Sequence, residues 1–117
     1  IAALAAIAKT TPLGEVWNNL GAAQSRRNLP GALDSFRKAQ AVAPTDPDYL
    51  FNLGYALWRR SEFDEGAQQF RAVLDLTPED EQAISMLGRC LQRTPPRDND
   101  LRVVGLERVK EKLDQKR

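Results

Sequence analysis

The sequence repeats itself at an interval close to 34 residues, and this repeat limits the possible folds more than any other feature. The stretch VWNNLGAAQSRR recurs as YLFNLGYALWRR and again as AISMLGRCLQR. Gly21 corresponds to Gly54 and then to Gly88, at offsets of 33 and 34 residues. Further along each copy, Phe36 matches Phe70 at an offset of 34. Periods of this length are typical of stacked supersecondary units that share one core.

Each repeat is predicted to be a pair of helices. In the second copy Leu50, Leu53, Gly54 and Leu57 fall at i, i+3, i+4 and i+7, which is helical spacing and not the alternation of a strand. Asp46, placed just before a proline, is a predicted N-cap. Because glycine weakens a helix, we expect the repeated glycines to mark a close approach of the partner helix.

The recurring residues resemble the tetratricopeptide repeat. The family signature is Trp-x2-Leu-Gly, then Ala-x3-Phe-x2-Ala, then Pro. The first copy matches it at seven positions, which are Trp17, Leu20, Gly21, Ala32, Phe36, Ala39 and Pro44. The second copy departs mildly, with Leu50 for the tryptophan and with Gly66 and Val73 for the alanines. The resemblance covers residues 14–93.

The resemblance implies an all-α, right-handed superhelix of helix-turn-helix repeats with about seven helices. The expected segments are a remnant of an upstream repeat helix over 1–12, repeat 1 over 13–46, repeat 2 over 47–80, and a divergent repeat 3 over 81–117. In the last segment Gly105, Val109 and Leu113 align with the second helix of repeat 2 at an offset of 39, and they predict a C-terminal capping helix. We expect a fragment of a larger bacterial protein, cut at its N-terminal edge.

Composition argues against several classes of function. The chain has no histidine and one cysteine, Cys90, so His-dependent acid–base pairs and nearly all familiar zinc sites are excluded. Seventeen Lys and Arg against 16 Asp and Glu leave a net charge of +1, without the basic excess of a nucleic-acid binder. The apolar N-terminal stretch is too short to span a bilayer. We therefore expect that the chain is not an enzyme and that it binds no metal, cofactor, nucleic acid or membrane. We expect Cys90 to be buried, and the sequence does not indicate a cellular compartment.

In tetratricopeptide proteins the stripe opposite the apolar face of each first helix lines a concave groove. Asn19 and Asn52 lie on that stripe, and an amide can both donate to and accept from the main chain of an extended peptide. The resemblance implies that these asparagines hold a ligand by its main chain. The alternative is that they bond only a neighbouring helix or water.

Three aromatic residues, Phe51, Tyr55 and Trp58, lie on the same stripe at i, i+4 and i+7. An exposed aromatic patch there predicts a binding hot spot centred on Tyr55 and Trp58, with Phe51 the most readily packed. The alternative is packing against the superhelix interior. For a hot spot, Trp58→Ala would weaken binding by about 2 kcal/mol and leave folding nearly intact, whereas Trp17 is expected in the core.

Arginines also recur on the stripe, and they predict attraction of an acidic ligand. The macrodipole alone would favour arginine near a helix C-terminus, so this interpretation has a simpler rival. Ala22 and Met86 occupy places where the carboxylate-clamp subset of the family requires polar groups, so we do not expect a receptor for chaperone tails. The arginines are Arg26, Arg59, Arg89 and Arg93.

The predicted function is a protein-protein interaction module, or scaffold, that binds a peptide or partner segment in the groove, with binding concentrated on repeat 2. The alternative is a structural spacer or an oligomerisation segment of a larger protein. We expect a monomer, or a weak dimer through the truncated N-terminal edge. Binding of single-stranded nucleic acid by the arginines and aromatics is disfavoured by the near-neutral charge.

Overall fold

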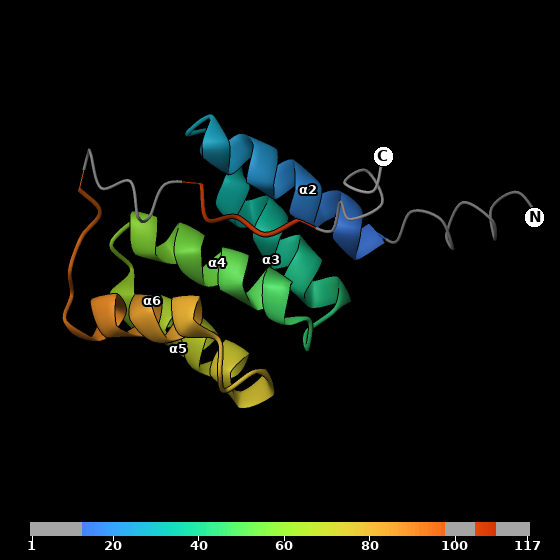
Figure 1. Cartoon of the computed structure of the whole chain (residues 1–117). Helices are drawn as coiled ribbons and strands as arrows, with labels where there is room; N and C mark the ends of the chain where they lie inside the picture. The colour runs from blue at the N-terminus through green and yellow to red at the C-terminus, as the bar shows by residue number, and fades with distance from the viewer. Residues whose placement is uncertain (1–12, 98–104, 110–117) are drawn as a thin grey trace, which may run out of the picture.

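The computed structural model describes residues 13–97 and 105–109, and its regular elements are five α-helices (Figure 1). They are α2 (Leu13–Arg26), α3 (Ala32–Val42), α4 (Pro47–Arg59), α5 (Phe63–Leu76) and α6 (Glu81–Leu91). No strand occurs in these residues, so the all-α prediction is confirmed. The prediction of about seven helices is not confirmed. The structure describes five, and the predicted remnant over 1–12 lies outside the described residues.

Aspartates begin two of the helices. The Asp46 carboxylate accepts hydrogen bonds from the backbone N–H groups of Asp48, at 2.9 Å, and Tyr49, at 3.4 Å, ahead of α4. Asp80 accepts from the N–H of Ala83, at 3.1 Å, at the start of α6. Each bond satisfies a donor that the first helical turn leaves unpaired. The N-cap predicted at Asp46 is therefore confirmed.

The turns that follow α2, α4 and α6 share one backbone feature. Asn28, Ser61 and Arg93 each adopt a left-handed conformation, with φ of 57°, 62° and 55°. Such a residue lets the chain reverse immediately after a helix. The same turn therefore recurs three times, in step with the sequence repeat.

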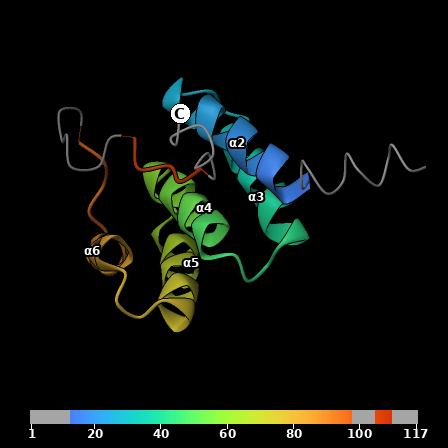
Figure 2. The same ribbon diagram turned by 45° about the vertical axis from the view of Figure 1, so that its right-hand side comes forward.

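Helices adjacent in sequence pack against one another, α2 on α3, α3 on α4, α4 on α5 and α5 on α6 (Figures 1 and 2). A Cβ added to Gly21 would lie 2.6 Å from the Phe36 ring, and one added to Gly54 would lie 3.0 Å from the Phe70 ring. The close approach predicted from these two glycines is confirmed. At Gly88 it is wrong, because nothing described lies within 4 Å of the corresponding position.

Helix α4 is buried on all sides, with every residue from Tyr49 to Trp58 in the interior. One apolar cluster joins Phe51 and Trp58 to α5 and α6, and a second joins Leu53 and Leu57 to α2 and α3. Trp17, expected in the core, is only partly buried and lies beneath the Lys38 ammonium, 4.4 Å from its ring centroid.

Residues 105–109 are not helical, which corrects the prediction of a capping helix across them. This segment, here called the strap, passes across α2 and α4 without helical turns (Figures 1 and 2). Gly105 has a φ of +68°, and the backbone N–H and C=O of Arg108 bond to side chains rather than along a helix. The remainder of the predicted helix, including Leu113, lies outside the described residues.

Candidate functional site

The strap is held by its main chain. The Asn52 carboxamide accepts from the Arg108 N–H at 2.7 Å and donates to the Arg108 carbonyl at 2.7 Å. Asn18 donates to the same carbonyl at 2.8 Å, and the two asparagines are joined by a 2.7 Å bond from Asn52 Nδ2 to Asn18 Oδ1. Both asparagines have no exposed surface. A side-chain amide pairs in this way with any backbone amide, so the contact is independent of the bound residue type.

Sequence reasoning placed both Asn18 and Asn19 on the groove stripe and chose Asn19 to hold a main chain, whereas in the structure Asn18 makes that contact. The repeat register aligns Asn19 with Asn52, but the asparagine that contacts Asn52 lies 34 residues before it. Asn19 Oδ1 is buried and has no hydrogen-bond partner among the described residues. A signal for Asn18 existed, because it shares the buried face of α2 with the small residues Gly14, Ala22 and Ser25.

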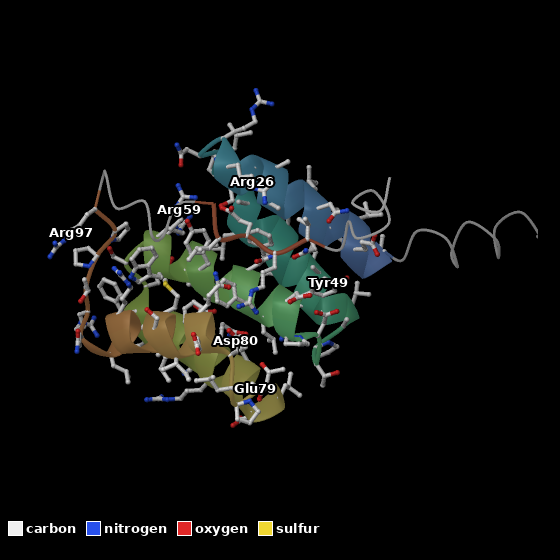
Figure 3. The ribbon with its side chains drawn as sticks, in the orientation of Figure 1. Arg26, Tyr49, Arg59, Glu79, Asp80 and Arg97 are labelled. Atoms are coloured by element: carbon white, nitrogen blue, oxygen red, sulfur yellow. The ribbon has the colours of Figure 1, made fainter. Side chains whose placement is uncertain are left out.

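The strap's glutamate is enclosed beside Asn18 and Asn52. Its carboxylate, on Glu107, is 1% exposed and accepts from the Ser25 hydroxyl and, at 3.4 Å, from Arg26 Nε. Arg59 Nη1 lies 3.7 Å from the same carboxylate and donates to Ser25 Oγ at 2.9 Å. Figure 3 labels Arg26 on α2 and Arg59 on α4. A buried carboxylate is tolerated only with such partners.

Arg108 of the strap is bound by a different set of side chains from those that contact Glu107. The Arg108 guanidinium donates to both Asp80 oxygens, at 2.8 and 3.0 Å, and to Gln82 at 2.8 Å. It lies 3.8 Å from Asp48 and 3.7 Å from the centroid of the Phe51 ring. These hydrogen bonds from Arg108 lower the pKa of Asp80 below its ordinary value. The site thus combines a bidentate ion pair with a cation-π contact.

Tyr55 and Trp58 do not form an exposed patch, since they are 2% and 1% exposed. Their rings stack at 6.0 Å, and Trp58 Nε1 donates to the Thr94 carbonyl at 2.7 Å. Burial, followed by the charge of Glu107, raises the pKa of Tyr55. The charge of Arg59, followed by backbone hydrogen bonding with Leu106 and Gly105, opposes that rise. Arg26 also contacts the strap's main chain, because its Nη2 donates to the Glu107 carbonyl at 3.3 Å.

The other two predicted arginines have different partners. Arg89 lies 5.9 Å from the Trp58 ring. Arg93 pairs with Asp64 at 3.1 Å and lies over the Phe63 ring. Neither contact involves the strap.

A cavity of about 400 Å³ adjoins the strap. Its wall includes Trp58 and Tyr55 from α4, Arg26 from α2, and Pro96 and Arg97. Figure 3 shows Arg97 on the segment that follows α6. The aromatic residues singled out from the sequence therefore border open space beside the strap, although their own surfaces are covered.

Over 13–97 and 105–109, no group of three or more His, Cys, Asp or Glu residues could hold a metal ion, and none of the five helices is long and apolar enough to cross a membrane. Cys90 is buried as predicted, and burial raises the pKa of its thiol to about 11.

No protein-family model matches this chain, and no curated protein is significantly similar to it.

Proposed function

We propose that this chain is a protein-protein interaction module of the tetratricopeptide type, which holds an extended partner segment by its main chain. The observation that carries the proposal is the Asn52 amide, which bonds both the N–H and the C=O of Arg108 at 2.7 Å. The thrice-repeated left-handed turn supports a superhelical stack of helix pairs. The ionisable groups at the site are bound to one another, as in structural ion pairs, which favours binding over catalysis.

The binding surface is called here the strap site, and it consists of Asn18, Ser25, Phe51, Asn52, Arg59 and Asp80. The chain's own strap occupies this site, so a partner segment binds by replacing the strap. A tethered segment acts at an effective concentration of about 1 mM. The apparent affinity for a partner is therefore lower than the intrinsic affinity by the fraction of molecules in which the strap is released. Weakening the strap should strengthen partner binding.

The test uses the full chain with Glu107→Ala and Arg108→Ala, which weaken the strap and lie outside the five helices. A fluorescent peptide with the strap sequence Gly-Leu-Glu-Arg-Val is titrated against it, with helix content checked by circular dichroism. N-methylation of the peptide's arginine nitrogen removes the donor to Asn52, and we expect it to weaken binding about 10- to 100-fold.

Methylation of the peptide's glutamate nitrogen is the matched control for the conformational effect of an N-methyl group. Among the described residues nothing accepts the Glu107 N–H, so this peptide should retain most of its affinity. The proposed function is wrong if the unmodified peptide does not bind, or if both methylated peptides bind as well as it does.

A further inference from the structure

Resting on this proposed function, we propose that the strap site selects partner segments in which an acidic residue is followed directly by an arginine. The occupant is a different protein with an extended, exposed segment of the pattern apolar-acidic-arginine-apolar. The strap carries this pattern as Leu106, Glu107, Arg108 and Val109.

The pocket for the acidic residue is positively charged and closed. Ser25 and Arg26 donate to the Glu107 carboxylate, which is 1% exposed, and Arg59 Nη1 lies 3.7 Å from it. Arg59 also donates to the Ser25 carbonyl at 3.0 Å, which fixes its guanidinium in place. An apolar side chain in this pocket would leave Ser25 without its acceptor, and a neutral amide such as glutamine would still leave the two arginines without a counter-charge.

The pocket for the arginine is negatively charged and flat. Asp80 presents both oxygens, Asp48 lies within 3.8 Å, and the Phe51 ring forms the floor. A planar guanidinium can bond two carboxylate oxygens and stack on a ring at once, whereas a lysine ammonium cannot match this bidentate geometry. The pocket therefore favours arginine over lysine.

The order of the two residues is fixed by the main chain between them. Asn52 holds both polar groups of one residue, so a shift by one position would give Asn52 the main chain of a neighbouring residue and would move the glutamate and the arginine out of their oppositely charged pockets. With the order reversed, an arginine would face Arg26 and Arg59, and a glutamate would face Asp48 and Asp80. Like charges meeting in a covered site oppose binding strongly.

The experiment compares four peptides on the full chain that carries Glu107→Ala and Arg108→Ala. They are Gly-Leu-Glu-Arg-Val, its reversed form Gly-Leu-Arg-Glu-Val, and the forms with glutamine in place of the glutamate or of the arginine. We expect each glutamine peptide to bind about tenfold more weakly than the first and the reversed peptide about 100-fold more weakly. The wild-type chain is titrated in parallel, in case the double variant unfolds. In the wild-type chain the strap competes with each peptide, which lowers all four affinities by the same factor and preserves their order.

Equal binding of the four peptides would overturn the selectivity and leave the proposed function standing. Failure of all four to bind would overturn both. Light scattering on the wild-type and double-variant chains adds one more outcome. A wild-type dimer that the double substitution abolishes would overturn the assignment to a different protein, because the strap of a second copy would then be the occupant.

Discussion

We expect Trp58→Ala to destabilise the fold far more than Trp17→Ala. Trp58 is 1% exposed, stacks on Tyr55 and donates through Nε1 to the Thr94 carbonyl. Removing a buried tryptophan costs about 3–5 kcal/mol, and the lost hydrogen bond adds about 1 kcal/mol. Trp17 is partly exposed, and its contact with Lys38 contributes about 0.5–1 kcal/mol. The expected losses in unfolding free energy are thus about 4–6 kcal/mol for Trp58→Ala and about 1–2 kcal/mol for Trp17→Ala.

The assay is urea denaturation followed by helical circular dichroism, which does not depend on the tryptophan removed. With an m-value of about 2 kcal/mol/M, the loss expected for Trp58→Ala lowers the midpoint by about 2–3 M, and that for Trp17→Ala by less than about 1 M. Equal midpoints, or a lower midpoint for Trp17→Ala, would refute the reasoning. That result would return Trp58 to the role of a ligand contact with little part in the core.

Three further substitutions and one chemical probe give distinct outcomes. Gly88→Ala should raise stability by about 0.5–1 kcal/mol in thermal melts, because space is open there, whereas Gly21→Ala should lower it by about 1–3 kcal/mol, because its Cβ would lie 2.6 Å from the Phe36 ring. Asp80→Asn keeps an N-cap but loses the ion pair with Arg108 that lowers the pKa of Asp80. At neutral pH, Asp80→Asn should lower the unfolding free energy by the full contribution of this ion pair. The difference between the variant and the wild type should shrink as the pH falls below about 4 and should vanish once the pH has passed below the lowered pKa of Asp80. Urea titrations at several pH values would measure this difference. Since burial raises the pKa of Cys90 to about 11, alkylation at pH 8 should be about 100-fold slower in the folded chain than in urea. Equal rates would contradict that burial.

The helix pairs could be predicted from the sequence because local signals determine them. Gly21 approaches Phe36 closely, and Gly54 approaches Phe70. In each pair the two residues are close enough in sequence to lie within a single repeat. Gly88 has the same local signal without the same packing, because the chain after α6 does not return as a second helix in the described residues. The glycine pattern alone therefore does not show whether a second helix packs against it.

The candidate site was only partly predictable for the same reason. Asn52, Arg26 and Arg59 were chosen for contacts to a main chain and an acidic group, and the structure places them against the strap. That the occupant lies in this chain, 56 residues beyond Asn52, follows from tertiary packing that no helical period encodes. Residues 105–109 fit a helical pattern, but hydrogen bonds from the asparagines replace those of a helix.

The strap also has a consequence for synthesis on the ribosome. The helix pairs close over short separations, whereas the bond from Asn18 to Arg108 joins residues 90 positions apart. Translation proceeds at about 5–20 residues per second, so the strap is completed about 1–4 s after α6. During that interval a nascent chain presents the asparagines without their intramolecular partner. Under the proposed function, a partner made nearby would bind before the strap exists, without having to displace it.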